Sequence, residues 1–231
     1  MFRGDRWALA TLLLLGVGLA GHSWLAAHPQ HNPWAPLHLS DPPGWATAMK
    51  LAALKDDGVI CRTVLAESGV AFRNLPAAGE GACLREDRLQ LTQFALDPEQ
   101  PVSTCAVAAG LEYWQRHVVQ PAAQDIFGSG VAQIEHLGTF SCRRLYGRSE
   151  GAFSQHATGN AIDVAGFRLD DDTFISVLGD WNDQGDKGQF LRRVRDGACS
   201  AFATVLSPDY NAAHADHFHL DQAGRWRSVC R

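Results

Sequence analysis

The sequence predicts an α+β domain that is exported behind an apolar N-terminal segment. Helical patterns come early in the domain, and alternating strand patterns cluster in its second half with one helix among them. All six cysteines follow the apolar segment. The 231 residues suffice for one sizeable core, and a net charge of −5 without a basic stripe argues against a nucleic-acid partner.

Residues 1–27 have the composition of a signal peptide or a membrane anchor. Two arginines precede an apolar run that carries no charge from Trp7 through Gly21. The run is short for a full membrane span, and "GLA" ending at Ala20 fits a cleavage site. The further apolar residues of "SWLAA" favour an anchor that is retained in the inner membrane, and this is the interpretation we adopt.

Residues 28–44 predict an extended, proline-rich tether. Five prolines between His28 and Trp45 disfavour a helix. We interpret His28, His31 and His38 as incidental polar residues of the linker rather than metal ligands. Residues 45–231 then form the folded domain.

Within this domain, the hydrophobic spacing predicts the elements in order. Residues 45–55 and 58–68 fit short amphipathic helices, and residues 105–120 fit a helix that stops or kinks before Pro121. Residues 189–206 fit a further helix with one apolar stripe. Alternating or β-branched patterns predict strands at 88–94, 131–140, 160–167, 173–181 and 217–221.

Six cysteines in an exported domain predict three disulfides. They are Cys61, Cys83, Cys105, Cys142, Cys199 and Cys230. No CxxC pair occurs, which disfavours a thiolate zinc site or a redox motif, and the sequence leaves fifteen pairings open. Closeness in sequence favours Cys61–Cys83, and a tie between the last helix and the C-terminal tail favours Cys199–Cys230, which leaves Cys105–Cys142.

Two stretches, "SQHATGNAIDVAGF" and "DHFHLD", combine histidines and an aspartate in a metal-ligand pattern. On a strand, Asp163 lies on a face that only small alanines share, and Gly159 allows the chain to fold back so that His156 reaches the same ion. His217 and His219 share a face of the second strand. A lone histidine or aspartate is more often structural, but two histidines and one aspartate form the three-ligand set that catalytic zinc uses.

These stretches resemble known motifs. "SQHATGNAID" matches the S-x-H-x-x-G-x-A-x-D pattern of the LAS metallopeptidases, which include D-Ala-D-Ala carboxypeptidases, lysostaphin-type endopeptidases and murein endopeptidases of the MepA type. "HADHFH" resembles their terminal histidine motif. From about Pro33 to the C-terminus the chain resembles the bacterial extensin-like C-terminal domain family, on phrases such as "IEHLGTFSCR" and "PDYNAAHADHFHLD".

The resemblance implies a fold and a ligand set. It implies a LAS or hedgehog-like peptidase core, in which a small antiparallel sheet flanked by helices carries the metal site. It assigns Zn²⁺ to His156, Asp163 and His219. It also implies that Arg143 and Ser154 contribute to substrate binding.

The resemblance leaves two candidates for the general base, His217 and Asp216. The resemblance gives His217 the role of activating water and His214 that of a further active-site histidine. Carboxypeptidases of the group often place a glutamate three residues before the last ligand, where this chain has Asp216. We expect His217 to be the base, with Asp216 as the alternative.

The expected function is a zinc-dependent peptidase or amidase-type hydrolase of the periplasm. Its expected substrates are peptide bonds in peptidoglycan stem peptides or cross-links. The alternative is a non-catalytic wall-binding or structural module that retains the fold.

Overall fold

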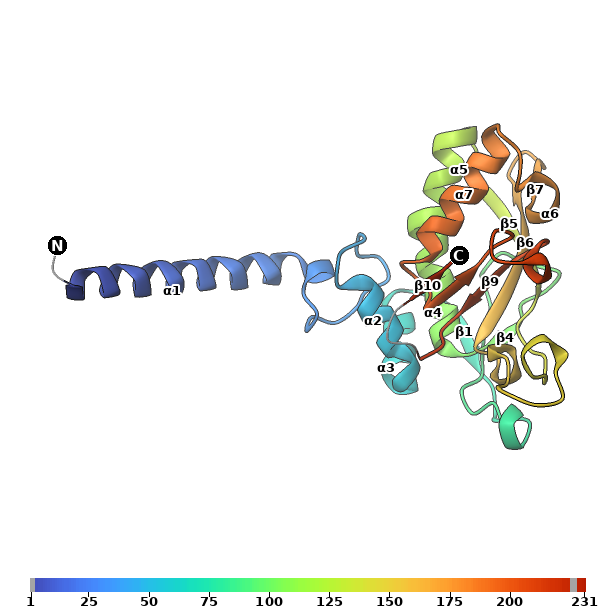
Figure 1. The fold of residues 1–231 in the computed structure, drawn as a ribbon, viewed down its shortest axis with the longest axis horizontal. Helices are drawn as coiled ribbons and strands as arrows, with labels where there is room; N and C mark the ends of the chain where they lie inside the picture. The colour runs from blue at the N-terminus through green and yellow to red at the C-terminus, as the bar shows by residue number, and fades with distance from the viewer. Residues whose placement is uncertain (1–2, 225–227) are drawn as a thin grey trace.

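The computed structural model describes residues 3–224 and 228–231. Its first element, helix α1 (Arg3–Ala27), extends away from the remainder of the molecule (Figure 1). Residues Asp5–Ala27 are long and apolar enough to cross a membrane, and none of that apolar window is buried. A signal sequence at the N-terminus has the same properties, so the length and composition of α1 fit a signal or an anchor.

The segment 28–44 packs against the domain instead of forming the extended tether that its prolines predict. It contains a short 3₁₀ helix, η1 (Pro29–His31), and it buries Leu37 and Leu39. The Leu39 N–H donates to the Ser68 hydroxyl at 3.0 Å, and the Leu39 carbonyl lies 2.8 Å from Nε2 of His117. The two leucines explain the difference, because a free tether would leave them in water.

The early helices form as predicted, with one change at the proline. They are α2 (Thr47–Ala53), η2 (Leu54–Asp56), α3 (Gly58–Glu67), α4 (Cys105–Trp114), the π-helical turn η4 (Gln115–Val119) and α5 (Gln120–Phe127). Pro121 is the second residue of α5 and follows the π-helical turn directly, so within this continuous helical run its missing N–H removes one backbone hydrogen bond to the preceding turn. The chain nevertheless continues through a π-turn and stays helical to Phe127.

Two sheets lie beside these helices. The larger has the order β10-β8-β9-β6-β5-β3, with β7 also paired to β6, and the smaller has the order β1-β2-β4. The larger sheet comprises β3 (Leu96–Asp97), β5 (Val131–Gly138), β6 (Ala161–Leu169), β7 (Phe174–Ser176), β8 (Thr204–Leu206), β9 (Phe218–Asp221) and β10 (Val229–Cys230). The smaller comprises β1 (Phe72–Asn74), β2 (Leu89–Leu91) and β4 (Val102–Ser103).

This arrangement confirms the α+β class and corrects the expected sheet. The larger sheet is mixed rather than purely antiparallel, because β3 runs parallel to β5 and β10 runs parallel to β8. Its central strands β5, β6 and β9 are antiparallel neighbours. Two of the three predicted metal ligands, Asp163 and His219, lie on β6 and β9 in this antiparallel part of the sheet.

Two predicted elements have different bounds. The strand expected at 173–181 ends after Ser176, whose hydroxyl accepts from the Gly179 N–H and begins the short helix α6 (Val177–Asp180). The helix expected at 189–206 is α7 (Asp186–Ala198) followed by strand β8. The β-branched Thr204 and Val205 pair with β9, and this tertiary pairing overrides the helical apolar stripe.

Aromatic side chains join the helical layer to the sheet. Helices α5 and α7 lie side by side against the sheet (Figure 1). The Trp114 ring of α4 lies 5.8 Å from the Phe167 ring of β6, which lies 5.1 Å from the Phe190 ring of α7. All three side chains are fully buried, so the aromatic contacts pack β6 against helices α4 and α7.

Three disulfides form, and no described cysteine is free. The predicted number and the pair Cys199–Cys230 are confirmed. The predicted pairs Cys61–Cys83 and Cys105–Cys142 are wrong, because the bonds are Cys61–Cys105 and Cys83–Cys142. Helix α3 packs on α4 and brings Cys61 to 6.1 Å from Cys105 between Cα atoms. The 3₁₀ helix η3 (Gly81–Cys83) instead meets the loop after β5.

Candidate metal centre

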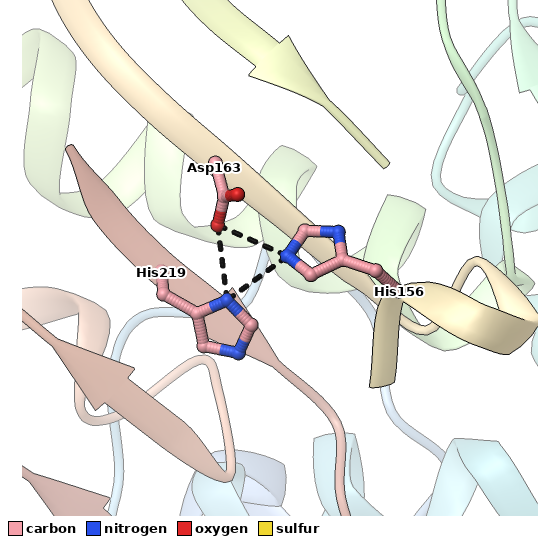
Figure 2. A group of neighbouring side chains, drawn as sticks. All are labelled: His156, Asp163 and His219. Atoms are coloured by element: carbon pink, nitrogen blue, oxygen red, sulfur yellow. Dashed lines mark hydrogen bonds and ion pairs between the residues drawn. The ribbon is translucent and has the colours of Figure 1, made fainter. Parts of the chain in front are cut away.

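Three side chains from separate elements meet at one point. Asp163 lies on β6 and His219 on β9, and these two residues are direct cross-strand partners. His156 comes from the 3₁₀ helix η6 (Gln155–Thr158). Figure 2 shows the three side chains pointing toward one another. Oδ1 of Asp163 lies 3.1 Å from Nε2 of His156 and 2.9 Å from Nδ1 of His219, and the two nitrogens are 3.1 Å apart.

Local backbone chemistry brings His156 to the strand. The Ser154 hydroxyl begins the turn by accepting a hydrogen bond from the His156 N–H. Gly159 ends it in the left-handed region at φ 71°, which a residue with a side chain adopts at a cost. The chain therefore reverses directly into β6, as the glycine predicts.

The donor set fits a metal ion. The three ligand atoms lie within 4.8 Å of one another, and His156 and His219 are buried. Each ring is oriented through its other nitrogen: Nδ1 of His156 lies 3.1 Å from the Thr139 carbonyl, and Nε2 of His219 lies 3.0 Å from Oδ2 of Asp221. Such partners outside the ligand set commonly hold metal-binding histidines in place.

Burial and hydrogen bonding act in opposite directions on the charges of Asp163 and His219. Burial opposes ionisation of Asp163, but hydrogen bonds from His156 and His219, with the charges of these rings, outweigh burial and lower the Asp163 pKa. Burial likewise opposes the charged form of His219, yet its hydrogen bonds to Asp163 and Asp221 outweigh it and raise the pKa to about 9. A metal ion bound at neutral pH would therefore replace a proton on His219.

His217 and Asp216 form a pair at the edge of this group. Strand β9 begins at Phe218, so both residues lie in the turn before it. Nδ1 of His217 lies 2.7 Å from Oδ1 of Asp216, and its Nε2 lies 3.6 Å from Oδ1 of Asp163. His217 therefore stands between the three-residue group and Asp216, whose side chain is 53% exposed.

His214 is a third histidine beside the group. Its ring centre lies 5.2 Å from that of His217 and 5.9 Å from that of His219, and Nδ1 bonds to the Asn211 side chain at 2.8 Å. Burial, followed by the nearby charges of His217 and His219, lowers the pKa of His214 to about 4. It is therefore neutral at physiological pH.

An open cavity of about 290 Å³ gives access to these groups. Besides the histidines and Asp163, it is lined by Arg143, Tyr146, Ser154 and Tyr210. The structure thus brings every predicted ligand, acid–base and substrate-binding residue except Asp216 to one cavity wall. Asp216 does not line the cavity and contacts Nδ1 of His217.

Two contributing residues were missing from the sequence prediction. Asp221 could have been found, because strand alternation places it on the same face as His219 two residues earlier. Thr139 acts through its backbone carbonyl, for which no side-chain pattern exists. Its role is visible only in the folded chain.

The fold and site define an α+β protein with three disulfides and a histidine–aspartate group whose ligand atoms lie close enough together to hold a metal ion. The chain belongs to the family described as "Extensin-like protein C-terminus", which matches residues 59–231. Comparisons with curated proteins and with solved structures found no match.

Proposed function

We propose that this protein is a zinc-dependent peptidase or amidase-type hydrolase that acts on peptide bonds of peptidoglycan stem peptides or cross-links. The observation that carries the proposal is the convergence of His156, Asp163 and His219 in one open cavity. The resemblance of "SQHATGNAID" and "HADHFH" to the LAS metallopeptidase motifs supports the reaction type and the substrate class.

In the proposed reaction, zinc would be held by Nε2 of His156, Oδ1 of Asp163 and Nδ1 of His219. A zinc ion in such a set polarises a carbonyl and makes water acidic enough to attack near neutral pH. His217 takes the proton of the attacking water, because its Nε2 lies at the edge of the ligand set. It then passes this proton to the leaving amine.

Asp216 supports His217 in this proposal rather than acting as the base. Its Oδ1 accepts from Nδ1–H of His217, which leaves the Nε2 lone pair of His217 toward the reacting water. Asp216 does not line the cavity, whereas His217 does. The neutral His214 next to His217 keeps further positive charge away from that ring.

Arg143 and Ser154 serve substrate binding in this proposal. The guanidinium of Arg143 lines the cavity, is exposed and has no ion-pair partner among the described residues. A guanidinium binds a carboxylate through two hydrogen bonds, and stem peptides carry carboxylates. The buried Ser154 hydroxyl accepts from the His156 N–H, so its own hydrogen is available to a substrate carbonyl.

We place the protein in the periplasm, held at the inner membrane by α1. The three disulfides fit an oxidising compartment outside the cytoplasm, and α1 is long enough to span the membrane. Peptidoglycan is the polymer that an enzyme in this position would meet.

The proposal is tested by digestion of purified peptidoglycan with the full chain in detergent, followed by mass spectrometry of soluble fragments. We expect peptide fragments with zinc, none after chelation, and recovery when zinc is restored. Asp163→Ala serves as the inactive control, because it removes the central ligand. Binding to peptidoglycan without release of any fragment would replace the hydrolase by a wall-binding module.

A further inference from the structure

We propose that Asp221 is a positioning residue that determines which nitrogen of His219 binds the metal. This inference rests on the proposed function, since it concerns the same metal site. Asp221 is 3% exposed, and its Oδ2 lies 3.0 Å from Nε2 of His219. The two residues are i and i+2 on β9, so their side chains share one face of the sheet.

This contact determines which nitrogen of the His219 ring carries the hydrogen. An ionised carboxylate can only accept hydrogen bonds, so Nε2 of His219 must carry the hydrogen that lies between them. In the neutral ring the lone pair is then on Nδ1, the atom that lies 2.9 Å from Asp163 and 3.1 Å from Nε2 of His156. Asp221 therefore presents the Nδ1 lone pair to the ion.

The other histidine uses the opposite nitrogen. Nδ1 of His156 lies 3.1 Å from the Thr139 carbonyl, which also can only accept, so Nε2 of His156 is the nitrogen with the free lone pair. The two rings are thus fixed in opposite tautomers by two separate acceptors. The acceptor for His156 is backbone, whereas the acceptor for His219 is a side chain that substitution can remove.

Both oxygens of Asp221 are used as acceptors. Oδ1 accepts from the Ala223 N–H at 2.8 Å while Oδ2 accepts from His219. Asp221 has no lysine or arginine partner among the described residues, so the buried charge faces the His219 ring alone. Burying a carboxylate without a cationic partner is costly, and the His219 ring supplies that partner, whether it is protonated or bound to a cation.

An amide cannot replace this carboxylate. Asparagine has one acceptor oxygen, so Asp221→Asn must lose the bond to Ala223 or the bond to His219. If the amide nitrogen faces His219, it donates to Nε2 and moves the ring hydrogen to Nδ1, the atom that the metal needs. We therefore expect Asp221→Asn to bind zinc roughly 10- to 100-fold more weakly than the unmodified chain.

The test measures zinc dissociation constants of the full chain by competition with a chromophoric chelator. Asp209→Asn is the matched control, because it makes the same change at a 59% exposed side chain that contacts Trp181 and Arg195 instead of the ligands. A second readout requires no variant: long-range ¹H–¹⁵N imidazole spectra of the zinc-loaded chain should show His219 protonated at Nε2 and His156 protonated at Nδ1.

The outcomes separate this inference from the proposed function. Weaker zinc binding by Asp221→Asn, with Asp209→Asn unchanged and the expected tautomers, supports it. Equal zinc affinity of Asp221→Asn and the unmodified chain, or a His219 bound through Nε2, overturns the inference and leaves the hydrolase proposal in place. An unmodified chain that binds no zinc overturns both.

Discussion

Replacing His217 and Asp216 separately and together tests how the proposed base works. His217 lines the cavity beside the ligand set, whereas Asp216 contacts His217 from the side away from it. If Asp216 acts only through His217, removing Asp216 can cost no more than the support it gives to that ring. The double variant should then resemble the single His217 variant.

The expected magnitudes follow from position and exposure. A positioned acid–base group contributes about 10²- to 10⁴-fold to the rate, so His217→Ala should raise the activation free energy by about 3–5 kcal/mol. The Asp216 side chain is 53% exposed, and an exposed ion pair contributes about 1 kcal/mol or less. Asp216→Asn should therefore slow the reaction by at most about fivefold.

The assay is the initial rate of fragment release from purified peptidoglycan, with the zinc content of each variant measured in parallel. His217→Ala should keep its zinc, because it lies outside the three-residue ligand set. The double variant should match His217→Ala within about twofold. A larger loss for Asp216→Asn than for His217→Ala would refute the assignment and make Asp216 the base, and additive losses in the double variant would contradict the idea that Asp216 acts only through His217.

Two further predictions concern stability and pH. Replacing Cys83 and Cys142 by serine opens a link between residues separated by 59 positions and should lower the free energy of unfolding by about 4 kcal/mol, measured with a chemical denaturant. Non-reducing peptide mapping that finds a Cys61–Cys83 bond instead would contradict the pairing behind this prediction. In the metal-free chain the His219 pKa is raised to about 9, so its charged form stabilises the fold fully below its ordinary pKa and loses this effect as the pH rises through 9. Zinc must displace that proton, so zinc affinity in a chelator-competition titration should rise between pH 7 and pH 9, and a flat profile would show that His219 is already neutral.

The convergence of the three side chains of the proposed metal site could be predicted because it depends on local periodicity. Alternation along β6 and β9 places Asp163 and His219 on the same side of their strands, and Gly159 marks the turn that returns His156. What the sequence lacks is the register between strands. Only the tertiary structure shows that Asp163 and His219 are direct cross-strand partners, and this register agrees with the alternation along each strand.

The errors also have a common physical origin in tertiary contacts. Cys61 pairs with Cys105 because α3 packs on α4, although Cys83 is nearer in sequence. Residues 204–206 join the sheet because β9 offers a partner strand, although their apolar pattern continues that of α7. The buried leucines of segment 28–44 likewise find their partners in the folded domain.

The most direct test of the central claim is the zinc content of the purified full chain and of three variants, His156→Ala, Asp163→Ala and His219→Ala, measured by mass spectrometry of the metal after dialysis. The account predicts one zinc per unmodified chain and a strong loss in each variant, because each removes one of the three converging ligand atoms. Full zinc retention by all three variants, or an unmodified chain without zinc, would contradict it.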